Sequence, residues 1–143
     1  MRGWLRGVTY GNGLFVAVGN EGTILTSRDG AAWTQRTSGT SKALLGVTYG
    51  NGLFVAVGYS GTILTSRDGV RWIRRTSGDD PLYDVTYGNG TFVAVGDGGI
   101  ILTSRDGVNW TRRTSPTGWL TGVAYGNGTF VAVGYRGTIL TSP

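Results

Sequence analysis

The chain has 143 residues, of which 39% are hydrophobic and 11% aromatic, and its formal net charge is +5. A chain of this size and composition can bury one hydrophobic core, which excludes a disordered polymer. Cysteine and histidine are both absent. Disulfides, thiolate nucleophiles, the commonest general base and the commonest transition-metal ligands are therefore missing, so we expect no enzyme, no catalytic residue, no metal site and no cofactor.

The basic residues are almost all arginines, twelve of the thirteen, and Lys42 is the single lysine. This balance permits a polyanionic partner. No apolar run is long enough to span a membrane, and the segment 1–5 lacks the apolar core of a signal peptide. We expect no membrane partner, and the sequence leaves the cellular compartment open.

The chain is built from four similar units. Val8, Val47, Val85 and Val123 occupy equivalent positions, spaced by 39, 38 and 38 residues. Each unit carries Tyr-Gly-Asn-Gly, then Phe-Val-Ala-Val-Gly, then Leu-Thr-Ser. A period close to forty residues is typical of propellers and other repeat arrays.

Turn chemistry divides the first unit into four strands. Asn12 and Gly13 lie between two apolar runs, which is a strong hairpin signal because a tight primed turn needs positive φ at both central residues. We predict strands near residues 5–10, 14–19, 23–27 and 33–37. The same hairpin recurs at Asn51, Asn89 and Asn127, so each unit is predicted to form a four-stranded antiparallel propeller blade.

The predicted fold is all-β, a single β-propeller domain over residues 1–143 with four blades per chain. The repeats span approximately residues 4–39, 43–78, 81–115 and 119–143, and the last unit lacks its outer strand. Solenoids fit less well. A parallel β-helix uses shorter coils without Asn-Gly hairpins, and helical repeats need a 3.6-residue apolar period that the sequence does not show.

A second motif, Ser-x-Asp-Gly-x-x-Trp, stands at one place in each of the first three units. Its residues are Ser27, Asp29, Gly30, Trp33, Ser66, Asp68, Gly69, Trp72, Ser104, Asp106, Gly107 and Trp110. The motif resembles the Asp-box, or BNR repeat, of sialidase, sortilin-type and photosystem II assembly-factor propellers. The resemblance covers nearly the whole chain and implies that the motif is the turn between the third and fourth strands of a blade.

The chemistry of these residues favours a structural role for the motif. Asp29 can accept backbone N–H groups of its own turn, and Ser27 can add another hydrogen bond. Gly30 can supply a positive φ, and Trp33 can cover the hairpin. A contribution to ligand or metal binding is the less favoured alternative. The catalytic residues of sialidases do not carry over, because the arginines here occupy repeated positions around a ring and cannot converge on one sugar carboxylate.

The most variable segments are the loops between the second and third strands and between consecutive units. A propeller presents both kinds of loop on one face, and recognition commonly uses variable loops on a rigid scaffold. Aromatic side chains there could stack on a sugar ring or anchor a peptide. The candidate ligand-binding residues are Trp4, Asn20, Glu21, Tyr59, Ser60, Asp97, Trp119, Tyr135 and Arg136, and the same loops include Lys42 and residues 79–81 and 116–119.

These features leave two classes of function open. One is a binding module, lectin-like or protein-binding, and the other is a structural or engineered repeat scaffold with no ligand. A basic rim made by Arg74, Arg75, Arg112 and Arg113 could bind nucleic acid or another polyanion, but no aromatic residues alternate with these arginines, so we do not expect a nucleic-acid partner. Their charge also discourages edge-to-edge strand pairing.

Repeated aromatic residues are predicted to pack within and between the blades rather than bind a ligand. They are Tyr10, Tyr49, Tyr87, Tyr125, Phe15, Phe54, Phe92 and Phe130. The small residues of the second strand favour a shallow turn from blade to blade, as in an eight-bladed ring. We therefore expect a homodimer in which two chains share one ring, because open apolar faces drive association. A closed four-bladed monomer is the alternative.

Overall fold

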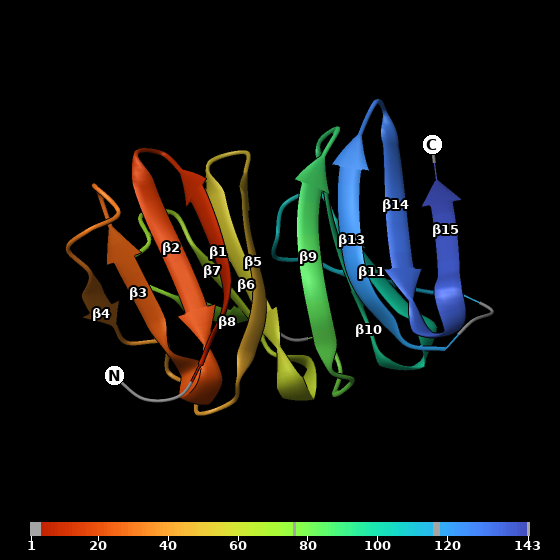
Figure 1. Ribbon diagram of the computed structural model, residues 1–143, viewed down its shortest axis with the longest axis horizontal. Helices are drawn as coiled ribbons and strands as arrows, with labels where there is room; N and C mark the ends of the chain where they lie inside the picture. The colour runs from red at the N-terminus through yellow and green to blue at the C-terminus, as the bar shows by residue number, and fades with distance from the viewer. Residues whose placement is uncertain (1–3, 76, 116–117, 143) are drawn as a thin grey trace.

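The computed structural model describes residues 4–75, 77–115 and 118–142. These residues form 15 strands in four antiparallel sheets, joined by tight turns and by four short 3-10 turns. Figure 1 shows the sheets along an arc, with the first sheet at one end and the last at the other. None of the helical segments in these ranges is long and apolar enough to cross a membrane.

Each sheet is a blade made of consecutive strands. Blade 1 comprises β1 (Leu5–Gly11), β2 (Leu14–Gly19), β3 (Ile24–Ser27) and β4 (Thr34–Arg36). Blade 2 comprises β5 (Leu44–Gly50), β6 (Leu53–Gly58), β7 (Ile63–Ser66) and β8 (Ile73–Arg75). Blade 3 comprises β9 (Leu82–Gly88), β10 (Thr91–Gly96), β11 (Ile100–Ser104) and β12 (Thr111–Thr114). Blade 4 comprises β13 (Leu120–Gly126), β14 (Thr129–Gly134) and β15 (Thr138–Ser142).

The turns form where the sequence predicts them. Every strand of blade 1 begins and ends within one residue of its predicted position. Asn12 and Gly13 have φ values of 51° and 75°, which are the left-handed angles that a primed hairpin turn requires. The second and third strands of the four blades are joined by the 3-10 turns η1 (Asn20–Gly22), η2 (Tyr59–Gly61), η3 (Asp97–Gly99) and η4 (Tyr135–Gly137).

The two faces of an inner blade are both buried. Side chains alternate between the faces of a sheet, and all six residues of β6 are buried. Three clusters of buried apolar residues therefore form, one between each pair of successive blades. Phe54 and Phe92 are 0% exposed within them, which confirms the predicted packing between blades for these two residues. Their equivalents in the end blades, Phe15 and Phe130, are half-buried.

Tyrosine and glycine fix how closely successive blades approach. A Cβ atom placed on Gly11 would lie 2.2 Å from the ring of Tyr49 in the next blade, so only glycine leaves room for that ring. The ring of Tyr49 also packs on Phe54 of its own blade, with centroids 4.6 Å apart. The same contact joins Gly50 to Tyr87 and Gly88 to Tyr125, with a Cβ-to-ring distance of 2.1 Å in both cases.

In each of the two end blades, one residue of this tyrosine–glycine contact has no partner within the chain. Tyr10 is 57% exposed, and a Cβ atom on Gly126 would have no neighbour within 4 Å. Apolar residues are exposed on the same faces, since Leu5 is 45% and Ile139 68% exposed, whereas Leu44, the counterpart of Leu5 in blade 2, is 0% exposed. Within the described ranges, a single chain therefore forms an open arc rather than a closed four-bladed ring.

We predict that Gly50→Ala destabilises the chain. The added methyl group would overlap the ring of Tyr87, and overpacking of this kind costs about 1–3 kcal/mol. Urea denaturation would measure the loss. Gly118→Ala is the matched control, because a Cβ atom there meets open space, and equal stability of the two variants would contradict the proposed tyrosine–glycine constraint.

Candidate functional site

The candidate site is the face that carries the 3-10 turns, at the lower edge of the blades in Figure 1. Each turn is bonded to the residue that precedes the first strand of its own blade. The N–H of Asn20 donates to the carbonyl of Trp4 at 2.9 Å, and the N–H of Tyr135 donates to the carbonyl of Trp119 at 3.0 Å. These bonds hold the variable turn and the incoming loop of a blade side by side, so we call this surface the loop face.

The centre of each 3-10 turn has left-handed backbone geometry. Glu21, Ser60 and Arg136 have φ values of 59°, 61° and 61°, a region that costs side-chain-bearing residues energy and that glycine enters without strain. Gly98 takes this place in blade 3, with φ of 68°. Three of the four turns thus hold a polar side chain on the loop face in spite of the backbone strain.

A cluster of two aromatic side chains and one arginine lies on blade 4. The rings of Trp119 and Tyr135 are tilted by 55° with their centroids 5.8 Å apart. The guanidinium carbon of Arg136 lies 5.5 Å from the centroid of the Tyr135 ring, a cation–π distance. Trp119 and Tyr135 are 52% and 58% exposed, so a large aromatic and cationic surface faces solvent.

A second cluster lies at the opposite end of the arc, on blade 1. Arg6 places its guanidinium carbon 5.5 Å from the ring of Trp4, and its Nε donates to Asn20 Oδ1 at 3.0 Å. Trp4 is 71% exposed. Trp4 and Asn20 thus lie side by side on the loop face, and Arg6, which was not among the residues selected from the sequence, contacts both side chains.

Between these clusters, an aromatic pair bridges blades 2 and 3. The rings of Tyr59 and Tyr83 meet edge to face with centroids 6.5 Å apart. Burial raises the pKa of the Tyr83 hydroxyl above its usual value, and the negative charge of Asp97 raises it further. Tyr83 was also missed from the sequence. Its signal was the variable second position of the inner strand, occupied by Arg6, Leu45, Tyr83 and Thr121.

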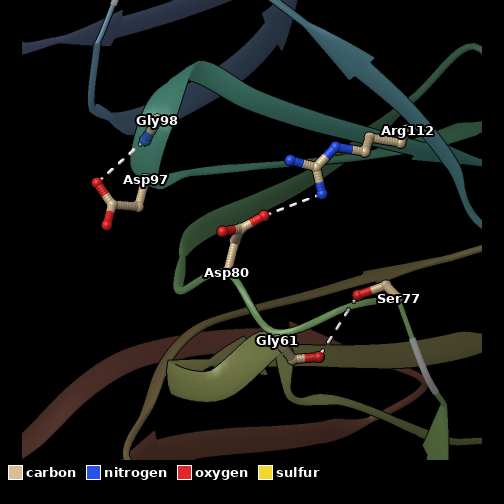
Figure 2. A network of polar contacts seen from close by, with 6 residues as sticks. All are labelled: Gly61, Ser77, Asp80, Asp97, Gly98 and Arg112. Atoms are coloured by element: carbon tan, nitrogen blue, oxygen red, sulfur yellow. Dashed lines mark hydrogen bonds and ion pairs between the residues drawn. The ribbon is translucent and has the colours of Figure 1, made fainter.

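Polar contacts within and between the neighbouring loops of blades 2 and 3 are shown in Figure 2. Asp97 accepts the N–H of Gly98 at 3.0 Å. Asp80 forms an ion pair with Arg112 at 2.9 Å, which couples the loop between blades 2 and 3 to the outer strand of blade 3. An exposed pair of this kind contributes about 0–1 kcal/mol, and it neutralises one of the arginines considered for a basic rim. Residues 116 and 117 of the corresponding loop before blade 4 lie outside the described residues.

On the opposite face, each Ser-x-Asp-Gly-x-x-Trp motif forms one hydrogen-bonded turn. Asp29 Oδ1 accepts the N–H groups of Ala31 and Ala32 at 2.9 and 3.0 Å. Ser27 Oγ donates to the same oxygen at 3.1 Å and accepts the N–H of Gly30 at 2.8 Å. The Ala32 N–H, then the Ala31 N–H, lowers the pKa of Asp29, because both bonds favour the carboxylate form.

The tryptophan closes this turn. Trp33 donates from Nε1 to the carbonyl of Gly30 at 3.2 Å, and its ring centroid lies 6.4 Å from that of Phe15. Gly30 has a φ of 79°. The pattern repeats in blades 2 and 3, with the motif residues Ser66, Asp68, Gly69, Trp72, Ser104, Asp106, Gly107 and Trp110. The polar groups of these turns are thus used by the turns themselves.

One further carboxylate, Asp84, joins the innermost strands of blades 3 and 4. Its Oδ1 accepts the N–H of Val85 at 2.9 Å, and its Oδ2 accepts the N–H of Val123 at 3.0 Å. Burial raises the pKa of Asp84, although the two N–H groups act in the opposite direction. Glycine occupies this position in the other units, at Gly7, Gly46 and Gly122. No cluster of three or more acidic side chains that could hold a metal ion occurs in residues 4–75, 77–115 and 118–142.

Comparison with solved structures places the fold among the β-propellers. The chain is similar to YCF48 from Cyanidioschyzon merolae (TM-score 0.76, 22% identity, covering 97% of this chain and 52% of that chain) and to YCF48 bound to D1 peptide (TM-score 0.78, 21% identity, 97% and 51% covered). It is similar to the computationally designed Ika4 protein (TM-score 0.79, 12% identity, 99% and 92% covered) and to the WD40 β-propeller domain of Doa1 (TM-score 0.74, 13% identity, 96% and 50% covered).

These similarities and the four sheets confirm the predicted β-propeller with four blades per chain. The chain spans about half the length of the YCF48 and Doa1 chains. No protein-family model matches the sequence, and no curated protein sequence matches it.

We predict that acid weakens the fold through the motif aspartates. Hydrogen bonds lower the folded-state pKa of Asp29, Asp68 and Asp106 below the unfolded value of about 3.9. Their stabilisation is therefore present above that pH and is lost as the pH falls through the folded-state pKa values. The melting temperature should drop between about pH 4 and pH 2, as followed by circular dichroism.

Asp68→Asn should be less stable than the parent at pH 7 and should show a shallower acid dependence, because one of the three titrating groups is removed. Asp84→Asn is the control. The raised pKa of Asp84 gives the opposite sign, since its contribution is greatest at low pH and declines as the pH rises through the folded-state pKa. An unchanged acid slope in Asp68→Asn would contradict the assignment.

Proposed function

We propose that the chain is a non-catalytic binding module that works as a ring of two copies and binds a protein ligand on the loop face. One observation supports the ring above all. Tyr10 at one end of the arc has no glycine to cover, and Gly126 at the other end has no tyrosine covering it. At each inner junction, a tyrosine of one blade covers the equivalent glycine of the preceding blade. In the ring, Tyr10 of each copy covers Gly126 of the other.

The apolar end faces support the same pairing. Ile139 on blade 4 corresponds to Ile24 of blade 1, which packs against blade 2 and is 0% exposed. Leu5 on blade 1 corresponds to Leu44, which packs in that same cluster. Joining blade 4 of one copy to blade 1 of the next would therefore bury faces of matched shape, and two such junctions would close eight blades with two-fold symmetry. The YCF48 and Doa1 chains are about twice as long as this chain, which supports a ring of two copies.

The ring would also complete the loop face. Tyr59 of blade 2 contacts Tyr83 of blade 3, and Tyr135 and Arg6 occupy the equivalent positions in blades 4 and 1. At the junction between copies, Tyr135 would therefore lie beside Arg6 of the second copy. The cluster of Trp119, Tyr135 and Arg136 would be joined there to Trp4 and Arg6, giving a composite aromatic and cationic surface twice per ring.

A protein ligand suits this surface better than the other classes. Exposed tryptophan, tyrosine and arginine are the residues that anchor protein interfaces, and YCF48, which has a similar fold, has been solved bound to D1 peptide. Within the described ranges, the carboxylates of the three motif turns and of Asp84 are engaged in structural hydrogen bonds. We further infer from the motif turns that the propeller is of the Asp-box, or BNR, type.

We predict that light scattering finds a particle of about twice the 15.1 kDa chain mass. Gly126→Ala should raise the dimer dissociation constant about tenfold or more, because its methyl group would meet Tyr10 of the other copy. It should leave the melting temperature of the monomer unchanged, since a Cβ atom at Gly126 meets open space within the chain. A parent protein that stays at the single-chain mass at high concentration would contradict the ring.

We predict that peptide arrays give signals and that Trp119→Ala and Tyr135→Ala each weaken the best peptide about tenfold or more. Val70→Ser is the control, because Val70 is exposed in a motif turn on the opposite face. Signals on a glycan array alone, lost in the same two variants, would instead identify a lectin-like module. No binding signal on either array at high protein concentration would identify a scaffold without a ligand.

A further inference from the structure

The innermost strand of each blade runs along the centre of the propeller. In the described part of the chain, β1, β5, β9 and β13 each pair with one neighbouring strand of their own sheet. They also lie next to one another from blade to blade, as β1 and β5 do in Figure 1. A propeller arranges its blades around a central channel, so the backbone groups on the other edge of these strands face that channel.

The hairpin turns determine which backbone groups these are. Gly11 pairs with Leu14 across a two-residue turn, and the pair that closes such a turn exchanges both of its backbone hydrogen bonds. Bonded and non-bonded pairs alternate along the ladder, so Val8 and Ala17 form a non-bonded pair. The N–H of Val8 therefore points away from β2 and toward the channel, and the N–H of Val47 in blade 2 does the same.

Blades 3 and 4 show what such N–H groups bind. Val85 and Val123 occupy the same position in their strands as Val8 does in β1. Both donate to the carboxylate of Asp84, Val85 to Oδ1 at 2.9 Å and Val123 to Oδ2 at 3.0 Å. Hydrogen bonds to a charged acceptor are stronger than those between neutral groups. One carboxylate thus bridges two successive inner strands, with one oxygen for each N–H.

Blades 1 and 2 have the same two donors without the aspartate, because glycine stands at its position in both blades. Their inner strands approach each other as those of blades 3 and 4 do. The tyrosine–glycine contact repeats with Cβ-to-ring distances of 2.2 Å at Gly11 and 2.1 Å at Gly88. The N–H groups of Val8 and Val47 are therefore arranged like the two around the aspartate, and no side chain of this position supplies their acceptor.

The space at Gly7, the counterpart of Asp84 in blade 1, is open enough for a carboxylate. A Cβ atom there would make only ordinary contacts, 3.4 Å from the carbonyl oxygen of Leu45, 3.5 Å from Gly46 Cα and 3.6 Å from Val18. A Cβ atom on Gly46 would instead lie 3.0 Å from Cα and 3.1 Å from Oδ1 of Asp84. Asp84 thus occupies the junctions on both sides of blade 3, and the junction between blades 1 and 2 is open.

Charge favours an anion at this open junction. The chain carries a net charge of +5, and Arg6 directly precedes Gly7, whereas the equivalent residue of blade 3 is Tyr83. The Arg6 guanidinium lies on the loop face beside Trp4 and Asn20. Since a strand rises about 3.3 Å per residue, Gly7 lies about 10 Å from Trp4 along the strand. An anion that enters the channel from the loop face would therefore pass a cation first.

We propose that the channel edge between blades 1 and 2 is a carboxylate-binding site. The N–H of Val8 donates to one oxygen of the bound carboxylate and the N–H of Val47 donates to the other. The group enters from the channel and binds as the Asp84 carboxylate does between blades 3 and 4. A free small carboxylic acid and an acidic side chain of a protein ligand offer the same chemistry. The site does not rest on the proposed ring or peptide face, because its donors belong to one chain.

Amide NMR spectroscopy of the whole, isotope-labelled chain tests the site one N–H at a time. Sodium acetate, exchanged for sodium chloride at constant ionic strength, should move the Val8 and Val47 amide protons downfield along saturable curves, because they form charge-assisted hydrogen bonds. The amides of Val85 and Val123 should stay in place, since Asp84 already binds them. Unmoved Val8 and Val47 amides, or equal shifts at all four, would overturn the site.

A variant that carries its own carboxylate should close the site. Gly7→Asp should raise the acetate dissociation constant about tenfold or more, and its Val8 and Val47 amides should resonate near their acetate-bound positions without acetate. Gln35→Glu is the matched control, because it adds the same charge on the exposed outer strand of blade 1, and it should bind acetate as the parent does. Equal weakening in both variants would reduce the effect to net charge and overturn the site.

The reverse change should open a second site. Asp84→Gly removes the bridging carboxylate, so the Val85 and Val123 amides should acquire a saturable response to acetate. This arm reads a gain of binding and does not depend on the folding of Gly7→Asp. If the Val85 and Val123 amides of folded Asp84→Gly ignored acetate, two such N–H groups would not suffice to bind a carboxylate, and the proposal would fail.

Two blocked peptides distinguish the sources of the carboxylate, acetyl-Gly-Glu-Gly-amide and its glutamine counterpart. Tighter binding of the glutamate peptide than of acetate, seen at the Val8 and Val47 amides, would identify an acidic side chain of a protein ligand. A response to acetate without a response to the glutamate peptide would identify a free small acid. An equal response to the glutamine peptide would overturn the proposal, because a neutral amide would then serve as well as a carboxylate.

Discussion

The close contact between a tyrosine ring and a glycine of the preceding blade constrains the whole molecule. At Gly11, Gly50 and Gly88 the ring of the next blade occupies the space that a Cβ atom would need. This contact sets the spacing of the inner strands, and the buried phenylalanines then fill the wider space between the blades. Because the contact is directional, from one blade to the next, an open array must expose a tyrosine at one end and a glycine at the other.

Local chemistry explains why so much of the fold could be predicted from the sequence. The Asn12-Gly13 turn and the Asp29 turn are each determined by residues within a few positions of one another, and repetition shows the same signals several times. The missed residues make contacts between separate segments of the chain. Arg6 bonds to the 3-10 turn of its own blade, and Tyr83 and Asp84 contact a neighbouring blade. No local sequence pattern encodes these contacts. Their signal in the sequence is variation between the units, since Arg6 and Tyr83 stand at a position that differs in all four units and Asp84 replaces a glycine.

The two faces of the propeller differ in how their turns use polar side chains. The polar groups of the motif turns hydrogen-bond within the turns themselves, so the face that carries these turns is rigid and repeats from blade to blade. The 3-10 turns instead display Glu21, Ser60 and Arg136 from left-handed positions that glycine would occupy without strain. Under the proposed function, stability therefore resides in what the units share, and recognition in what distinguishes them.

The surface left unpaired at the two ends of the arc is apolar. The outer faces of blades 1 and 4 are apolar, and apolar burial is non-directional and grows with area, so a second large and matched face satisfies them best. The proposed ring meets this requirement, because blade 4 of each copy would face blade 1 of the other.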